Sequence, residues 1–155
     1  MVDNREDIHN RIKDELRAWL ESMGCVVHSE RDIPLHFPNR NDRRYLLKYG
    51  KFRNISSFPK AIYKPSLGKT TLVKPKKCIR VDLLGYKDKL TKNFVIEISH
   101  TSDIAQEAKK LKKLNWIETK IIVRTDRMEG KLNGIPIIPY EKFRKWFTEN
   151  FLKNP

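Results

Sequence analysis

The sequence predicts an α/β fold with one central mixed β-sheet flanked by helices. Segments whose apolar residues recur every three or four positions alternate along the chain with short apolar segments rich in β-branched residues. A chain of 155 residues has room for one domain with one hydrophobic core. We therefore expect a single domain over residues 1–155, into which a segment of residues 33–77, called here the basic segment, is inserted.

The first two elements are a helix and a strand. From Asp3 to Met23 the apolar residues lie at three- and four-residue steps, and Gly24 then stops the helix. Cys25–His28 predicts the first strand, which ends near Glu30.

The basic segment of residues 33–77 follows this strand. It contains five prolines and no sustained periodicity, so we expect extended pieces and turns rather than a long helix. Within it, Lys60–Tyr63 and Thr70–Val73 predict a hairpin with Gly68 at the turn.

The remaining elements complete a core in the order α-β-β-β-α-β, followed by a further strand and a C-terminal helix. Two of the strands, joined by the polar stretch Gly85–Asn93, predict a hairpin. In chain order, the elements are the strands Cys78–Leu84 and Phe94–Ser99, the helix Asp103–Leu114, the strands Lys120–Val123 and Ile135–Ile138, and an amphipathic helix from Tyr140.

Positive charge is concentrated in the basic segment. The chain has 33 Lys and Arg against 19 Asp and Glu, a formal net charge of +14, of which residues 33–77 carry +11. Charge of this kind predicts contacts with nucleic-acid phosphates. The aromatic residues of the segment either stack on bases or pack the segment onto the domain. Its cationic residues are Arg40, Arg43, Arg44, Lys48, Lys51, Arg53, Lys60, Lys64, Lys69, Lys74, Lys76 and Lys77.

The sequence argues against three other kinds of protein. No apolar stretch approaches the roughly 20 residues that span a bilayer, and the charged first helix is unlike a signal peptide, so we expect no membrane partner. Cys25 and Cys78 lie in predicted strands, which indicates free buried thiols and a reducing, cytoplasmic compartment. The histidines and cysteines lack the paired spacing of a zinc site.

Two acidic residues lie within otherwise apolar strands. Side chains alternate along a strand, so Glu97 shares a face with Val95 and Ser99. A symmetric hairpin pairs Leu84 with Val95. In that register Asp82 lies directly opposite Glu97, where two like charges are destabilising. We therefore expect a cation between them.

Two sources of this cation remain open. In one, the register differs and an acid pairs with Arg80 or Lys120. In the other, Asp82 and Glu97 hold Mg²⁺ or Mn²⁺ together with the backbone carbonyl of Ile98, because hard divalent ions prefer oxygen ligands. Such an ion activates water and stabilises a phosphorane-like transition state.

These residues carry a family resemblance. Val81-Asp82, a short turn, and Val95-Ile96-Glu97-Ile98-Ser99 before a helix and a strand resemble the PD-(D/E)XK, or restriction-endonuclease-like, nuclease superfamily, including archaeal relatives of Holliday-junction resolvases. The resemblance covers roughly residues 3–124, with the basic segment as an insertion. It implies that Asp82 and Glu97 bind the metal ion and that Glu15, an acid in the first helix, completes the site.

A subset of archaeal relatives implies a second set of residues. These relatives have an acid, a histidine and a lysine on the first helix, and a glutamate at the end of the first strand. The similar residues in this chain are Glu6, His9, Lys13 and Glu30.

The chain departs from the family at its last motif position, where Ser99 stands instead of lysine. That lysine helps to position the attacking water and to stabilise developing charge. Relatives that move it to the following helix imply a substitute among Lys109, Lys110 and Lys113, and Lys13 is another. The alternative is that these lysines form a solvated face. His100, just past Ser99, either contacts a phosphate, transfers a proton or caps the next turn.

Three hypotheses of function follow. The first is a metal-dependent endonuclease that hydrolyses phosphodiester bonds in duplex or branched DNA. The second is a nucleic-acid-binding protein of the same fold that has lost the reaction, because Ser99 replaces the lysine. The third is an RNA-binding module that uses the aromatic residues of the basic segment on single strands. The Phe- and Trp-rich last helix is either a homodimer interface or part of the core.

Overall fold

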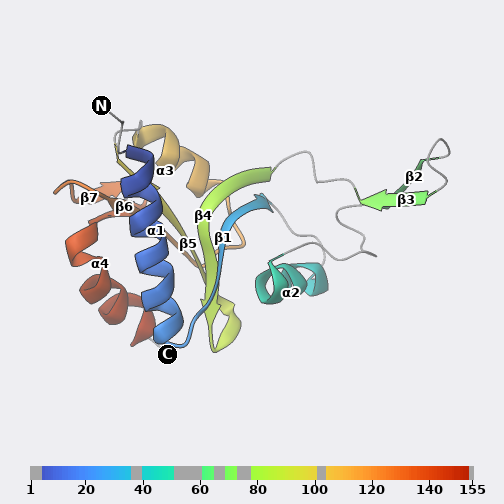
Figure 1. Ribbon diagram of the computed structural model, residues 1–155, viewed down its shortest axis with the longest axis horizontal. Coiled ribbons are helices and arrows are strands. Elements are labelled where there is room, and N and C mark those ends of the chain that lie inside the picture. Colours follow the sequence, from blue (N-terminus) through green and yellow to red (C-terminus); the bar gives the residue numbers. More distant parts are fainter. Residues whose placement is uncertain are drawn as a thin grey trace.

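A computed structural model describes residues 5–35, 40–50, 61–64, 69–72, 78–100 and 104–153, with side chains over 7–35, 41, 43–50, 78–100 and 104–153. None of the helices in these ranges is both long and apolar enough to cross a bilayer. The elements, labelled in Figure 1 except for the π-helical turn η1, are α1 (Arg5–Ser22), β1 (Val26–Pro34), α2 (Arg40–Tyr49), β2 (Ala61–Lys64), β3 (Lys69–Leu72), β4 (Cys78–Lys87), β5 (Lys89–Ser99), α3 (Ile104–Lys112), β6 (Thr119–Arg124), β7 (Gly130–Leu132), β8 (Ile135–Pro139), α4 (Tyr140–Phe147) and η1 (Thr148–Leu152).

Six strands form one mixed sheet in the order β1-β4-β5-β6-β8-β7. β1, β4 and β5 are antiparallel neighbours, β6 and β8 continue the sheet in parallel with β5, and β7 returns antiparallel to β8. The predicted α/β class, a central mixed sheet flanked by helices, is confirmed. The predicted hairpin in the basic segment is present as β2 and β3, with Ala61 opposite Leu72. Gly68, expected at its turn, lies outside the described residues.

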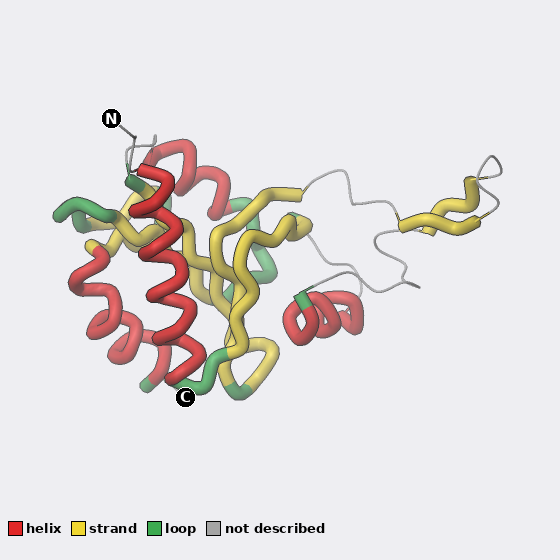
Figure 2. Tube along the Cα trace, viewed as in Figure 1, coloured by secondary structure: helices red, strands yellow, loops and turns green. Residues whose placement is uncertain are grey.

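Apolar side chains fill both faces of the large sheet, which explains why its central strands are apolar on both sides. α1, which Figure 2 shows in front of the strands, packs on one face together with α4. α2 and α3 supply the apolar cover of the other face. Buried residues of the first cluster include Ile12, Leu16, Leu83, Phe94, Ile96 and Phe143, and those of the second include Leu46, Leu47, Val81, Leu84, Val95 and Leu111.

The aromatic residues of the last helix complete the first of these clusters. Phe143, Phe147 and Phe151 are buried. The rings of Phe147 and Phe151 stack with centroids 4.6 Å apart, and both meet Phe94 edge-on at 5.3 Å. Of the two roles predicted for this helix, these contacts support the core, and the homodimer stays a prediction.

α2 corrects the expectation of extended structure in the basic segment. Arg40–Tyr49 forms a ten-residue helix in a stretch free of proline. Leu46 and Leu47 are buried in the second cluster. Tertiary packing of two adjacent leucines therefore stabilises a helix too short to show a sustained period in the sequence.

The strand boundaries also differ from the prediction. β4 and β5 continue through most of the polar stretch Gly85–Asn93 and meet at Asp88, which has a φ of 63°. β7 was not predicted, because three residues are too few to show an alternating pattern.

Candidate active site

The hairpin of β4 and β5 has the register that the sequence predicts. Leu83 pairs with Ile96 and Leu84 with Val95, so the same register carried one residue further places Asp82 opposite Glu97. Within the described residues, the backbone pairing ends at Leu83. There the Ile98 amide donates a hydrogen bond of 2.7 Å to Asp82 Oδ2. The carboxylate of Asp82 thus takes the place of a backbone acceptor.

β4 changes the face that it presents to the core at Asp82. Leu83 packs in the cluster with α1, whereas Val81, two residues away, packs in the cluster with α3. Strict alternation would keep these two side chains on one face. Glu30, opposite Asp82 in the β1–β4 register, has a φ of 52°, a left-handed conformation uncommon outside glycine. The irregularity of both strands brings Asp82 within reach of α1.

Glu97 is a buried acid, with 9% of its surface exposed. Its Oε2 atom is buried and has no hydrogen-bond partner among the described residues. Burial, and then the negative charge of Asp82, raise the pKa of Glu97 to about 8, while the positive charge of Lys110 acts in the opposite direction. A carboxylate in this state is stabilised by any cation that reaches Oε2.

Lys110 supplies a cation beside Glu97. Its Nζ lies 3.5 Å from Glu97 Oε1 and donates a hydrogen bond of 3.1 Å to the Arg80 carbonyl. The two cations predicted as alternatives lie elsewhere. The Arg80 guanidinium is 3.5 Å from Asp32, and Lys120 Nζ donates to a backbone carbonyl that follows α3, at 3.1 Å. The alternative with a different register is therefore wrong.

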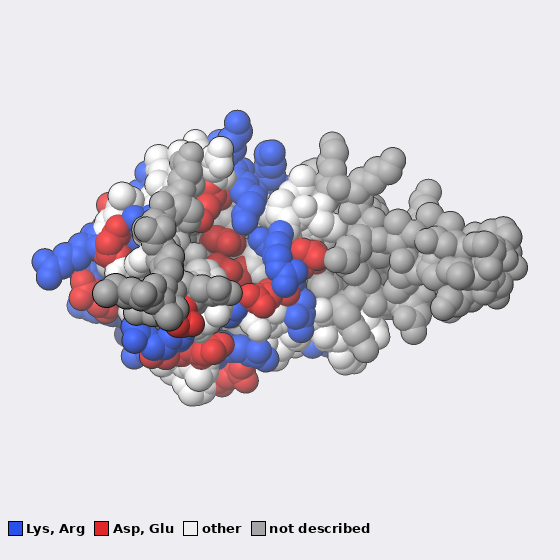
Figure 3. All heavy atoms as spheres, turned by 45° about the horizontal axis from the view of Figure 1, so that its top comes forward, with Lys and Arg blue, Asp and Glu red and all other residues white. Residues whose placement is uncertain are grey.

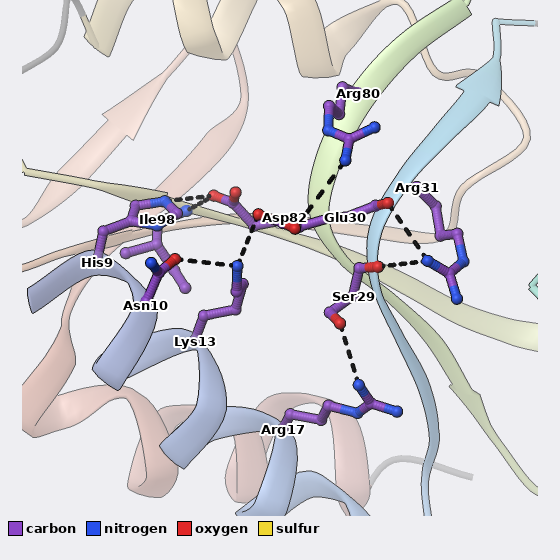
Figure 4. A network of polar contacts seen from close by, with 10 residues as sticks. All are labelled: His9, Asn10, Lys13, Arg17, Ser29, Glu30, Arg31, Arg80, Asp82 and Ile98. Atoms are coloured by element: carbon purple, nitrogen blue, oxygen red, sulfur yellow. Dashed lines mark hydrogen bonds and ion pairs between the residues drawn. The ribbon is translucent and has the colours of Figure 1, made fainter. Parts of the chain in front are cut away.

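Side chains of α1 contact residues of β4 and β1 from the sheet face opposite to α3 (Figure 4). His9 Nε2 lies 3.2 Å from Asp82 Oδ2. One turn further along, Lys13, only 6% exposed, donates to Glu30 Oε1 at 2.8 Å and to Asn10 Oδ1 at 3.2 Å. The hydrogen bond from Lys13 and its charge lower the pKa of Glu30. Three of the four residues implied by the archaeal relatives thus lie next to Asp82.

Ser99, at the position of the family's lysine, is fully buried. Arg124, which pairs with it across β5 and β6, donates a hydrogen bond of 3.0 Å from Nη1 to the Ser99 hydroxyl. The same guanidinium donates twice to the Asp126 carboxylate. A cation from the neighbouring strand therefore fills the space beside Ser99. His100 contacts the Thr125 hydroxyl, and its roles with phosphate or proton stay predictions.

The structure does not bring Glu15 to the carboxylate pair. Glu15 is exposed, and the Tyr140 hydroxyl donates a hydrogen bond to it. It follows Lys13 by two residues, which is about 200° around a helix, so the two side chains leave α1 on opposite sides. The side chain of Glu6, the fourth residue of the archaeal set, lies outside the described residues.

Among the predicted substitutes on α3, only Lys110 contacts a carboxylate of the pair in the described part of the chain. Lys109 and Lys113 are exposed. For these two lysines the solvated-face alternative describes the structure better.

Part of the charge of the basic segment can be placed. Arg43, Arg44 and Lys48 lie on α2, which packs against β4 and β5. Arg40, Lys64 and Lys69 lie in α2, β2 and β3, where only their backbone is described. The residues outside the described ranges are Lys51, Arg53, Lys60, Lys74, Lys76 and Lys77.

The carboxylate pair fits a divalent cation. Asp82 and Glu97 offer oxygen ligands from adjacent strands, and the buried Oε2 of Glu97 has no hydrogen-bond partner in the ranges that the structure describes. Within the described residues, no three side chains of His, Cys, Asp or Glu already converge on one point. The Ile98 carbonyl stays a predicted ligand. Figure 3 shows acidic side chains gathered on one face, bordered by Lys and Arg.

Two residues of this region were not identified from the sequence. Arg124 follows Ile122 and Val123 at the end of a buried strand, and a cation there requires a partner, which is the signal that would have found it. Asn10 carries no such signal, because its role depends on how α1 is rotated.

A scan against protein-family models, a search of curated proteins and a search of solved structures found no match. The residues of the chain and their geometry are therefore the basis of the functional proposal.

Proposed function

We propose that the protein is a metal-dependent nuclease of the PD-(D/E)XK type that hydrolyses phosphodiester bonds in DNA. The observation that carries the proposal is the Asp82/Glu97 pair, in which Glu97 is buried and its Oε2 atom has no hydrogen-bond partner in the described part of the chain. The order of α1, β1, β4, β5, α3 and β6 follows the core that the family resemblance implies. Both observations support a catalytic pair set in the middle of the sheet.

Asp82 and Glu97 are the residues that would hold Mg²⁺ or Mn²⁺. When bound, such an ion lowers the pKa of a water ligand and offsets negative charge on the phosphate. The Ile98 amide and His9 fix the Asp82 carboxylate through one oxygen, Oδ2, and leave Oδ1 for a ligand. Glu97 lies near Lys110 through Oε1, and its buried Oε2 is the oxygen without a described partner. Among the contacts of the described residues, each acid therefore has one oxygen that is available to an ion.

Lys110 is the cation that we assign to the role of the family's lysine. Its Nζ, 3.5 Å from Glu97, is close enough to stabilise the negative charge that develops on a phosphate bound at the pair. Its hydrogen bond to the Arg80 carbonyl fixes the long side chain, so less conformational entropy is lost when substrate binds. Lys13 is engaged with Glu30 and has the role of orienting that residue.

The net charge of +11 over residues 33–77 supports DNA as the substrate, because binding to phosphates requires cations arranged along the backbone. α2 fixes part of this charge beside β4 and β5, the strands that carry the pair. A duplex or branched DNA held by the basic segment would thus lie next to the carboxylates.

A catalytically impaired protein of the same fold is the second candidate. It is favoured by Ser99, which is buried against Arg124, so β5 itself presents no cation to the substrate. Such a protein binds nucleic acid and does not cleave it. An RNA-binding module is the third candidate.

Cleavage of a substrate panel separates these candidates. The full chain is incubated with Mg²⁺ or Mn²⁺ and with duplex, single-stranded, flap and four-way DNA, and with single-stranded RNA. We expect cleavage of DNA by the wild type, loss of at least about 100-fold in Glu97→Gln and Asp82→Asn, and wild-type cleavage by Glu149→Gln, which changes an exposed glutamate. Lys110→Met should lower cleavage with little loss of binding.

The other results of this cleavage assay distinguish the remaining candidates or refute the proposed site. Binding of DNA without cleavage under all conditions identifies the impaired protein, and binding confined to RNA identifies the RNA-binding module. Cleavage that survives Glu97→Gln unchanged would show that the pair is not the active site.

A further inference from the structure

The solvent-facing side of α2 carries two tyrosines and two cations in adjacent rows. Tyr45 and Tyr49 are one helical turn apart, as are Arg44 and Lys48. The centroids of the two tyrosine rings lie 4.6 Å apart, with the planes inclined at 48°. Tyr49 is 57% exposed, and Arg44 and Lys48 are exposed as well. α2 thus presents aromatic surface and positive charge together to solvent.

The opposite side of α2 is fixed to the sheet. Leu46 and Leu47 are buried in the cluster that includes Val95 of β5. His28 Nε2 of β1 forms a hydrogen bond of 2.7 Å with the Leu47 carbonyl. The Gly50 amide closes the helix by donating to the Leu46 carbonyl at 2.7 Å. The exposed side of α2 is therefore held in place by the contacts that the opposite side makes with the sheet.

Folding does not account for the exposed ring of Tyr49. An aromatic pair one turn apart stabilises a helix only slightly. Tyr49 remains more than half exposed, so its ring contributes little to the core that Leu46 and Leu47 complete. An aromatic side chain of this kind, next to cations, is suited to a ligand that has both a flat apolar face and a negative charge.

We infer that the exposed side of α2 binds unpaired nucleotides of a DNA strand, with Tyr45 and Tyr49 stacked on bases and Arg44 and Lys48 on the adjoining phosphates. The inference rests on the proposed function in taking nucleic acid as the partner. Every base has an aromatic face, but a duplex keeps these faces stacked inside and presents phosphates to its partners. The tyrosines therefore favour unpaired DNA, whereas the cations alone do not discriminate between unpaired and duplex DNA.

The position of α2 extends this preference to the substrate of the proposed nuclease. Leu46 and Leu47 share a cluster with Leu84 and Val95, so α2 covers the sheet face to which Glu97 belongs. A strand bound on α2 thus lies on the same side of the sheet as Glu97 and Lys110. The substrate class that we assign is DNA with an unpaired segment, such as a single strand, a flap or an open junction.

Binding measured without cleavage tests this inference. Fluorescence anisotropy is recorded in EDTA with the full chain for labelled oligothymidine, oligouridine and a DNA duplex. Each probe has about 20 nucleotides per strand, which exceeds the roughly 4–16 nucleotides that a single-strand site covers. We expect Tyr49→Ala to weaken binding of oligothymidine roughly 10-fold or more, and binding of the duplex less than about 2-fold. Tyr49→Phe, which keeps the ring, should bind as the wild type does. Replacing both Arg44 and Lys48 by glutamine should weaken all three probes and reduce their salt dependence.

Several results would overturn the inference: an equal loss on duplex and single strand for Tyr49→Ala, a loss confined to oligouridine, or no loss on any probe. Thermal unfolding of Tyr49→Ala is measured alongside. If Tyr49→Ala is unstable, the binding test is repeated with Tyr45→Ala. EDTA keeps the outcome separate from the proposed activity. A protein that never cleaves can still bind unpaired DNA through Tyr49, and a protein that cleaves can lack the preference.

Discussion

Glu97→Gln removes an ionisable group from the buried site and keeps the volume of the side chain. The substitution therefore tests how the charge of Glu97 affects stability. Burial, and then the charge of Asp82, raise the pKa of Glu97 from 4.5 to about 8. Between these pH values the folded protein keeps a proton that the unfolded chain has released. The free energy of unfolding of the metal-free protein therefore falls as pH rises through this range.

The size of this effect can be bounded from the pKa. A change from 4.5 to about 8 is equivalent to about 5 kcal/mol at roughly 1.4 kcal/mol per pH unit. This is an upper limit, because Asp82 and Glu97 titrate as a pair and Lys110 already offsets part of the charge. We expect the wild type to lose about 2–4 kcal/mol between pH 5 and pH 8.5 through this group.

Urea unfolding followed by tryptophan fluorescence in EDTA measures the effect at these two pH values. Wild type and Glu97→Gln should be similar in stability at pH 5, and the variant should be the more stable by about 2–4 kcal/mol at pH 8.5. Glu149→Gln, which changes an exposed glutamate, should follow the wild type throughout. A wild type and a Glu97→Gln variant with the same pH dependence would refute a buried, protonated Glu97.

Two further predictions concern residues that support the site. Gly50→Ala would place a Cβ atom 2.6 Å from His28 Nδ1 at a residue with a φ of 69°. We expect this substitution to lower the free energy of unfolding in urea by about 2–3 kcal/mol. The control is Gly134→Ala, where φ is 78° and a Cβ atom would meet nothing within 4 Å, and its expected cost is about 1 kcal/mol. Equal losses would contradict the packing of α2 on β1. The hydrogen bond from Arg124 is the largest cause that lowers the pKa of Asp126, to about 2. The stability that Asp126 contributes is therefore present above its unfolded pKa near 4 and disappears as pH falls toward 2. Thermal unfolding of Asp126→Asn should thus show destabilisation at pH 7 that vanishes near pH 2, and a difference independent of pH would argue against the ion pair.

The sheet could be predicted because its central strands carry their own signal. Strands buried on both faces are continuously apolar, as in β5 and β6. The pairing of Leu84 with Val95 was predicted correctly although the turn was placed wrongly. Beyond the Leu84–Val95 pair, both strands continue by two residues to the pairing of Tyr86 with Asn93, which leaves the register unchanged.

The irregular part of β1 and β4 could not be predicted. Alternation places Asp82 on the same side as Glu97, and only the change of face there, with Glu30 in a left-handed conformation, brings His9 into contact with Asp82. A single sequence gives no signal for such a backbone conformation at a non-glycine residue.

The choice among the lysines of α3 was open to a sharper prediction than the sequence analysis made. The apolar residues of this segment are Ile104, Ala108, Leu111 and Leu114, and a turn of 100° per residue places Lys110 nearer to the middle of their face than Lys109. The sequence marks less clearly which face of α1 packs on the sheet. Glu15 satisfied the chain order of the family motif, yet the structure places it beside Tyr140.

Titration of the full chain with Mn²⁺, followed by the loss of the free-ion electron paramagnetic resonance signal, tests the central claim most directly, because it asks whether Asp82 and Glu97 form a divalent-cation site. We predict that the wild type binds Mn²⁺ at one site, that Glu97→Gln and Asp82→Asn each abolish this binding, and that Glu149→Gln does not alter it. Binding of Mn²⁺ that is unchanged in both variants of the pair, or no binding by the wild type at millimolar Mn²⁺, would contradict the claim.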